Sequence, residues 1–239
     1  MDTNSAVKLF RPARRGGTRA YTTVIRIQPR PARFPQMWRD VWEHRALLFL
    51  FVWREITLRY KQTAVGLVWV ILQPLLMMVV FSLFFSSMLP TDGLPYPLFV
   101  YTGLIVWQLF SKTLSHITVV LKEHESIITR VYFPRIILPL SAVLTAVIDF
   151  FVSLSVLLVL MVYYDLYPSW PAFIAPLFIG LAILTALSLG LWLSMMDIVY
   201  RDVRQTLPII LQAWMFMTPV IYSTSLVSPG WQSFYALNP

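Results

Sequence analysis

The chain has 239 residues, of which 58% are hydrophobic, 15% are aromatic and only 13% are charged, and its mean hydropathy is +0.69. A soluble domain of this composition would have to expose most of its apolar surface to water, so the composition excludes that class and indicates a polytopic membrane protein. The formal net charge of +8 would suit nucleic acid, but thirteen of the nineteen Lys and Arg residues precede Ala64, where they would lie against anionic lipid headgroups.

Residues 1–33 have the composition of a basic, flexible tail. They contain eight Lys and Arg residues against a single acid, Asp2, with prolines and a pair of glycines between them. No apolar region precedes a small-residue cleavage site, so this segment is not expected to be a signal peptide.

Residues 34–63 carry the pattern of an amphipathic helix. Apolar and aromatic residues recur mostly at steps of three and four, with charged residues between them. The uninterrupted apolar run over 46–53 is too short to cross a bilayer, so we predict a helix that lies in the membrane interface and is anchored by its tryptophans. A helix packed on a partner protein fits the same pattern, and the two interpretations are compatible.

Five longer apolar segments follow, at about 64–88, 98–121, 136–163, 173–196 and 206–227. Each has the roughly 20 residues that a transmembrane helix needs. The N-terminal region and the alternate loops on its side carry eighteen Lys and Arg residues, and the loops on the other side carry none. The positive-inside rule therefore places the N-terminus in the cytoplasm. The expected fold is all-α, with an interfacial helix followed by a transmembrane domain over 64–239.

Two charged residues fall inside the expected spans. Asp149 lies near the middle of the third span, and Lys112 lies on the second span at a depth that differs by about 6 Å. A lysine side chain can lean over such a distance toward a partner. One interpretation makes Asp149 a conduit or gate residue, since intramembrane charges are costly and often functional. The other makes it one half of an interhelical pair, or a hydrogen-bond partner of Ser111, Ser115 or His116.

An aromatic stripe runs along the first span. Trp69, Gln73, Met77, Phe81 and Phe84 follow one another at steps of three or four and so share one side of a helix. Aromatic rings that face a conduit can stack on the apolar C–H faces of sugars. Ordinary packing, or a belt of aromatic residues at the headgroups, gives the same pattern.

Several kinds of site are not expected in this chain. The sequence has no cysteine, which excludes a disulfide framework and a thiolate nucleophile, and its three histidines have no metal-ligand spacing. It also lacks a GxxxxGK[ST] phosphate loop, so it is not expected to hydrolyse ATP by itself. The energy for any active transport would come from another subunit.

Two charged loops on the cytoplasmic side are candidate contact points for such a subunit. Residues 122–135 form a short amphipathic segment, which Pro134 terminates. Its possible docking face consists of Ile127, Ile128, Val131 and Tyr132. Residues 197–206 carry four charges in a short turn. Solvated loops that merely satisfy the positive-inside rule would look the same.

Three ordered motifs resemble one known family. They are WREITLRYKQTAVGLVWVILQPLLMMVVF from Trp53, TRVYFPRIILPLS from Thr129 and YRDVRQTLPIILQ from Tyr200. In order and spacing they are similar to signatures of the permease subunits of bacterial type 2 ABC exporters, which export O-antigen, capsule or teichoic acid. The resemblance covers the chain from about Arg33 to its last residue.

The resemblance implies a homodimer of permeases in the bacterial inner membrane, paired with two copies of a separate ATPase that binds ATP and Mg. This chain would then be no enzyme and hold no cofactor, and the cargo would be a lipid-linked polysaccharide. The residues implied to couple to the ATPase are Glu123, Ser126, Ile127, Ile128, Arg130, Tyr132, Arg135, Arg201 and Asp202. The candidate conduit lining is Trp69, Gln73, Met77, Phe81, Phe84, Trp107, Phe110 and Trp214, together with the charges of Lys112 and Asp149.

The family continues with re-entrant helices and a sixth span, so the sequence is expected to be truncated after Pro239. Two other functions fit the same residues less fully. One is a membrane enzyme or scaffold of glycan–lipid assembly, which would need convergent acid, base or metal-binding residues near one membrane face. The other is the permease of an ABC exporter of small hydrophobic molecules, which would share the fold and differ in cargo.

Overall fold

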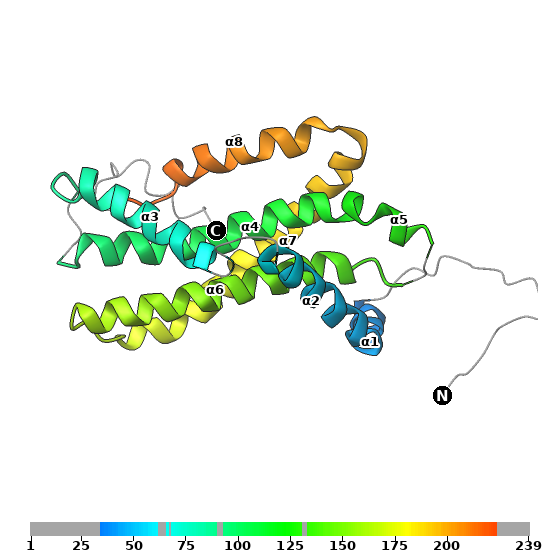
Figure 1. The fold of residues 1–239 in the computed structure, drawn as a ribbon, viewed down its shortest axis with the longest axis horizontal. Coiled ribbons are helices and arrows are strands. Elements are labelled where there is room, and N and C mark those ends of the chain that lie inside the picture. The colour runs from blue at the N-terminus through cyan, green and yellow to red at the C-terminus, as the bar shows by residue number, and fades with distance from the viewer. Residues whose placement is uncertain (1–33, 62–65, 67, 90–92, 131–132, 224–239) are drawn as a thin grey trace, which may run out of the picture. The chain divides into compact units, whose positions relative to one another are not determined.

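The computed structural model describes residues 34–61, 66, 68–89, 93–130 and 133–223, and every regular element in these residues is helical (Figure 1). The predicted all-α class is therefore confirmed. The basic tail expected over 1–33 lies outside the described residues. The elements are α1 (Phe34–Glu43), α2 (Arg45–Lys61), α3 (Val68–Phe85), α4 (Tyr96–Glu123), α5 (Glu125–Ile128), α6 (Ile137–Tyr163), the 3₁₀ helix η1 (Trp170–Ile174), α7 (Ala175–Val199) and α8 (Asp202–Met217).

Four helical segments in the described part of the chain are long and apolar enough to cross a membrane. They are Val68–Phe85, Tyr96–Glu123, Ile137–Tyr163 and Ala172–Val199. These correspond to the first four expected spans, with ends that differ by a few residues.

The fifth expected span, over 206–227, differs from the observed helix. Helix α8 begins at Asp202, ends at Met217 and has 16 residues. Thr218 adopts an extended conformation with φ −98° and ψ 143°. Pro219 follows it, and a proline disfavours the helical conformation of the residue before it. The continuous helix expected here is therefore wrong: the chain leaves the helix at Thr218, and residues 224–227 lie outside the described part.

Helix α4 is the centre of the bundle, and it packs on α3, α6, α7 and α8. Its contact with α7 is close because α7 turns a row of small residues toward it. Ala182, Ala186, Gly190 and Ser194 follow at steps of four, and all are buried. A Cβ atom at Gly190 would lie 2.8 Å from the Cβ of Ile117, so only glycine fits at this crossing.

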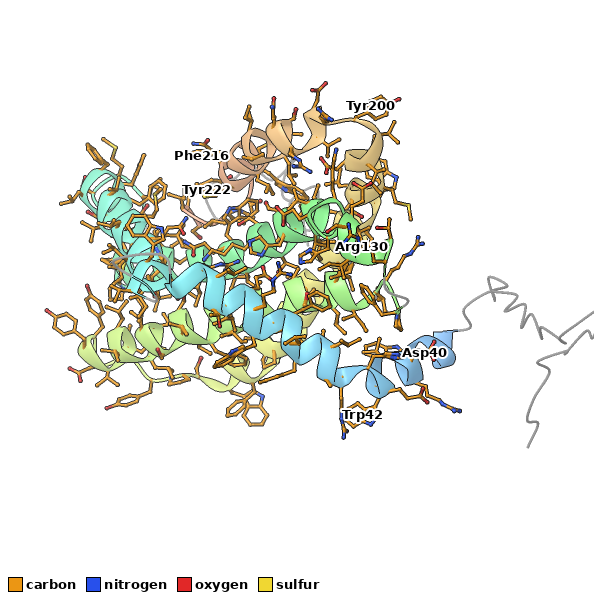
Figure 2. The ribbon with its side chains drawn as sticks, turned by 45° about the vertical axis from the view of Figure 1, so that its right-hand side comes forward. Asp40, Trp42, Arg130, Tyr200, Phe216 and Tyr222 are labelled. Atoms are coloured by element: carbon orange, nitrogen blue, oxygen red, sulfur yellow. The ribbon has the colours of Figure 1, made fainter. Side chains whose placement is uncertain are left out.

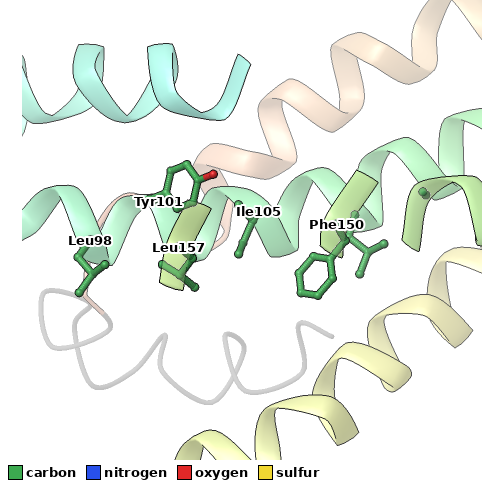
Figure 3. Close-up of a cluster of buried hydrophobic side chains, with 7 residues drawn as sticks. Leu98, Tyr101, Ile105, Phe150 and Leu157 are labelled. Carbon is green, nitrogen blue, oxygen red and sulfur yellow. The ribbon is translucent and has the colours of Figure 1, made fainter. Parts of the chain in front are cut away.

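A second set of contacts joins α4 to α6. Leu98, Tyr101 and Ile105 pack against Phe150 and Leu157 in one buried cluster (Figure 3). The hydroxyl of Tyr101 donates a hydrogen bond to the carbonyl oxygen of Ser153, 3.1 Å away, so the one polar atom of that ring is satisfied. Between membrane-spanning helices, such a contact is stabilised by close van der Waals packing, because lipid tails are as apolar as these side chains.

The single helix expected over 34–63 is two helices, interrupted by a turn at His44. The imidazole Nδ1 of His44 lies 2.8 Å from the backbone oxygen of Asp40, so this side chain binds the end of α1. Trp38 and Trp42 of α1 are exposed, and Figure 2 shows Trp42 on the outer side of the helix. Phe49 and Trp53 continue the same exposed face on α2, where their rings stack with centroids 6.3 Å apart. The location of this aromatic face at a membrane interface stays a prediction.

Candidate functional site

Three helices meet at a charged cluster inside the bundle. Asp149 of α6 has only 4% of its side chain exposed. Its Oδ2 lies 3.0 Å from Nη1 of Arg59 on α2 and 3.6 Å from Nζ of Lys112 on α4. One carboxylate oxygen therefore faces cations from two different helices, and this pairing offsets the cost of burying its charge.

Glu55 extends the cluster toward α5. Its Oε1 lies 3.2 Å from Nδ1 of His116, and its Oε2 accepts a hydrogen bond of 3.3 Å from the hydroxyl of Thr145. Nη2 of Arg59 lies 3.4 Å from Glu55 Oε1 and 3.1 Å from Nε2 of His116. A His116 ring with its proton on Nδ1 can donate to Glu55. Nη2 of Arg59 lies 3.3 and 3.1 Å from the two ring nitrogens of His116, so the guanidinium lies against the ring.

This setting changes the acidity of Glu55. Burial raises the pKa of its carboxyl group. The hydrogen bond with His116 and the positive charge of Arg59 oppose burial, and together they hold the pKa below its ordinary value. The ionised form of Glu55 is thus the form that the folded protein favours.

Lys112 and Asp149 lie together, as their depths in the sequence predicted. His116, considered in the sequence as a partner of Asp149, contacts Glu55 and Arg59. Glu55 and Arg59 themselves were not singled out. The signal that reveals them is a shared spacing. Each of the three helices contributes two polar residues four positions apart, which places both on one helix face. The pairs are Glu55 and Arg59, Lys112 and His116, and Thr145 and Asp149.

The cluster also shows the path of α2 along the bundle. Phe51 packs edge-on against His124, just beyond the end of α4, with ring centroids 5.6 Å apart. Eight residues later, Arg59 reaches Asp149. Asp149 lies twelve residues after the start of α6, or about 18 Å at 1.5 Å per residue. Helix α2 therefore runs obliquely along the bundle (Figure 1).

The aromatic stripe expected on the first span is divided between two environments. Trp69, Gln73, Met77 and Phe84 are exposed on one side of α3. Phe81 is buried instead, and it packs with residues of α4 and of the segment after α8. Phe81 follows Met77 by four residues and precedes Phe84 by three. It nevertheless lies on the packed side of α3, the side on which Val70 and Pro74 are also buried.

The other three candidate conduit residues form a compact aromatic cluster between α4 and α8. Trp107 and Phe110 come from α4, and Trp214 comes from α8. The ring centroids of Trp214 lie 6.3 Å from those of Trp107 and 5.3 Å from those of Phe110, both in edge-to-face geometry. These rings line a cavity of about 150 Å³ that Ala182 and Thr218 also border. The structure thus brings these three residues together but does not bring them to the exposed side of α3.

The candidate coupling segment contains less helix than expected. Among the described residues of 123–135, α4 ends at Glu123 and one further short helix, Glu125–Ile128, follows; the hydroxyl of Thr129 closes it by donating to the backbone oxygen of Glu125. Four of the candidate coupling residues in this segment are exposed: Glu123, Ser126, Arg130 and Arg135. Tyr132 and its neighbour Val131 lie outside the described residues. Ile127 and Ile128 are half-buried and pack against the core around Phe133, and their part in a docking face stays a prediction.

The second charged loop divides in the same way. Arg201 and Asp202 are exposed, at the turn that Tyr200 marks in Figure 2. Asp197 is fully buried and pairs with Arg204, two residues that sequence patterns did not single out. Among the described residues, no three His, Asp or Glu side chains come close enough to hold a metal ion.

Comparison with known proteins decides the family. The model of the ABC-2 type transporter family matches residues 46–239. The chain belongs to the ABC-2 type transporter family. The match begins at the second residue of α2, so Glu55 and Arg59 lie inside the family region and α1 lies outside it.

Two relatives give the family match more detail. The chain is 30% identical over 203 residues to the O-antigen export system permease protein RfbA of Myxococcus xanthus, which covers 84% of this chain and 78% of the relative. It is 25% identical over 195 residues to the protein of the same name from Klebsiella pneumoniae, which covers 81% of this chain and 75% of the relative. An ABC-2 transporter with apolar helices of this length is a membrane protein. Helix α2, which carries Glu55 and Arg59 of the charged cluster, lies in the matched region.

Proposed function

We propose that this ABC-2 transporter chain is the permease of an exporter that moves a lipid-linked polysaccharide across the bacterial inner membrane. The observation that carries the proposal is the 30% identity, over 84% of the chain, to a permease named for O-antigen export. The N-terminus is cytoplasmic in this proposal, because eighteen Lys and Arg residues lie on that side of the predicted spans.

The permease acts as a homodimer with two copies of a separate ATP-binding subunit, which holds the ATP and Mg. The short helix α5 is the contact to that subunit. The exposed charges in and just after α5, above all Arg130, form the contact, and the half-buried Ile127 and Ile128 connect α5 to α2 through a shared core. A change of a few kcal/mol in the free energy of the contact at α5 would bias the position of α2 against the bundle.

The exposed side of α3 and the Trp107–Phe110–Trp214 cluster form the wall along which the glycan passes. Two features support this assignment. Trp69 and Phe84 present ring faces that the chain does not cover, and Gln73 places a hydrogen-bonding amide between them on an otherwise apolar helix. Rings and amides together suit sugars, which have apolar faces and hydroxyl edges.

The experiment that tests this function uses the full-length protein in a strain that lacks its own copy. Export is measured as polysaccharide on the cell surface, and the purified protein is analysed for the subunits and lipids that accompany it. We expect restored export and a stoichiometric P-loop ATPase. A chain that purifies without an ATPase and leaves surface polysaccharide unchanged would contradict the proposal.

Arg130 gives a sharper test of the coupling contact. Replacement by glutamate should reduce copurification of the ATPase, because it reverses an exposed charge at α5, whereas Arg130→Lys keeps the charge and should leave copurification intact. Equal ATPase recovery from both variants would place the contact elsewhere.

A further inference from the structure

The chain that directly follows α8 is held against α4 at two points, Tyr96 and Gly103. We call this segment, residues 218–221, the strap. We propose that Tyr96 and Gly103 are positioning residues for the candidate conduit wall, because they fix the strap and, through it, Trp214. This assignment rests on the proposed function, in which Trp214 belongs to the wall, and it adds two residues of α4 that lie outside the aromatic cluster.

The strap needs hydrogen-bond partners because it is non-helical backbone at membrane depth, where lipid tails offer none. It lies against Gly103, which is seven residues, or about 10 Å, inside the span that begins at Tyr96. Two of its hydrogen bonds lead back to α8. The backbone N–H and the hydroxyl of Thr218 both donate to the backbone oxygen of Trp214, each at 3.0 Å. The strap is therefore tied to the turn of α8 that carries Trp214.

Tyr96 supplies a donor for the far end of the strap. Its hydroxyl donates to the backbone oxygen of Ile221, 3.1 Å away, and both residues are buried. Around this contact, Val220 and Ile221 pack in one buried cluster with residues of α3 and α4. A carbonyl oxygen among such side chains is costly to leave without a donor, so the hydroxyl of Tyr96 fixes where the strap ends.

Gly103 allows the strap to lie directly on α4. A Cβ atom at Gly103 would lie 2.8 Å from the backbone oxygen of Val220 and 3.3 Å from its Cα. These two atoms belong to the backbone, so the rotation of a side chain would not relieve the clash. Any side chain at position 103 would therefore push the strap away from α4.

The strap and Trp214 line the same cavity, which connects the two contacts on α4 to the candidate conduit wall. The cavity of about 150 Å³ beside the aromatic cluster is bordered by Gly103, by Trp214 and by strap residues 218–220. The ring of Trp214 meets Phe110 edge-on there. A strap displaced from α4 would take the end of α8 with it, so the edge-on contact of Trp214 depends on Tyr96 and Gly103.

One thiol reports whether the strap stays on α4. The chain has no cysteine, so Val220→Cys places a single reactive group on the strap, at a position that is only 6% exposed. The rate of its reaction with N-ethylmaleimide, a reagent small and apolar enough to enter a micelle, is measured on the full-length protein in detergent. A second reporter, Ala186→Cys, lies fully buried on α7 and detects opening of the bundle.

Both residues of α4 are predicted to protect the strap thiol. Gly103→Ala should speed labelling of Val220→Cys by at least about fivefold, because the added methyl group displaces the strap. Tyr96→Phe removes one hydrogen bond and should speed labelling by about two- to tenfold. Gly180→Ala is the matched control and should leave the rate unchanged, since a Cβ added there meets no atom of the described residues within 4 Å. A parent rate in either the Gly103 or the Tyr96 variant would overturn the proposal.

The second reporter separates a displaced strap from an opened bundle. Ala186→Cys should stay protected in both variants, because Ala186 packs with Phe110 and Leu114 in a cluster apart from the strap. If Gly103→Ala speeds labelling of Ala186→Cys, the bundle itself has opened, and Tyr96→Phe replaces that variant throughout. A parent rate for Val220→Cys in Tyr96→Phe then overturns the proposal.

Export shows whether the strap acts through Trp214. Gly103→Ala and Trp214→Ala should each lower surface polysaccharide about two- to tenfold, with the ATPase recovered as in the parent. The double variant should export as much as the weaker single variant, because both changes remove the same ring contact. Losses that multiply in the double variant overturn the proposal. A parent protein that exports nothing contradicts the proposed function instead, and the thiol at position 220 still decides whether Tyr96 and Gly103 hold the strap.

Discussion

Asp197 and Arg204 hold each other across the turn between α7 and α8 through two parallel contacts. Nε of Arg204 lies 3.2 Å from Oδ1 of Asp197, and Nη2 lies 2.7 Å from Oδ2. Nζ of Lys122, at the end of α4, donates to the backbone oxygen of the same aspartate at 3.3 Å. One residue therefore ties the ends of three helices, close to the exposed Arg201 and Asp202.

Removing either partner of this pair should have unequal effects. Arg204→Ala leaves a carboxylate that is fully buried, whereas Asp197→Asn leaves an arginine side chain that is 38% exposed and can reach water. We expect the melting temperature in detergent to fall further for Arg204→Ala than for Asp197→Asn. The melting temperature of Arg204→Lys should lie between those of Arg204→Ala and Asp197→Asn, because a lysine cannot form both contacts at once. Equal losses for the two partners would contradict this reading of the pair.

The crossing of α4 and α7 should be sensitive to one methyl group. Gly190→Ala places a Cβ 2.8 Å from Ile117, so the helices must separate, and overpacking of this kind costs about 1–3 kcal/mol. Gly180 on the same helix has no atom within 4 Å of an added Cβ. Gly180→Ala should therefore be neutral or stabilise by about 0.5–1 kcal/mol, as alanine does in a helix. Thermal unfolding of both variants checks the difference.

Glu55 should make the stability of the protein depend on pH in acid. Its pKa is lowered in the folded state, so its contribution is fully present above the ordinary glutamate pKa and is lost as the pH falls through the folded pKa. The difference in melting temperature between the parent and Glu55→Gln should therefore shrink between about pH 5 and pH 3. Glu43→Gln is the control, because Glu43 lies in an exposed ion pair that contributes little. If the difference in melting temperature between the parent and Glu55→Gln stays constant over this pH range, the ionised carboxylate is not what stabilises α2.

The exposed rings of α3 should matter for export but not for folding. Trp69→Ala should lower surface polysaccharide about two- to tenfold, as expected for one ring contact of about 0.5–1.5 kcal/mol. Trp192 on α7 is the matched control, since it is 62% exposed where Trp69 is 56% exposed. Trp192→Ala should leave export unchanged, and both variants should bind the ATPase as the parent does. Equal export from the two variants would remove α3 from the conduit wall.

The sequence predicted most of the helices because apolar length is a strong local signal, and α3, α4, α6 and α7 all follow from it. The end of α8 was missed because the run of apolar residues continues past Pro219, and hydropathy does not register the backbone effect of a proline. The contact of α2 with the charged cluster was missed for another reason. Its aromatic face indicates a membrane surface, but Glu55 and Arg59 acquire their meaning only from His116 and Asp149, which are distant in the chain.

The lengths of the helices around α4 differ enough to affect the lipid beside them. Helices α3 and α8, with 18 and 16 residues, are about 27 and 24 Å long, whereas α4 and α6, with 28 and 27 residues, exceed 40 Å. A hydrocarbon core is about 30 Å thick, and a span such as α3 that is shorter than this is accommodated by local thinning of the bilayer. In the proposed exporter, a thinner bilayer beside α3 would shorten the path that a polar headgroup has to travel between the two leaflets.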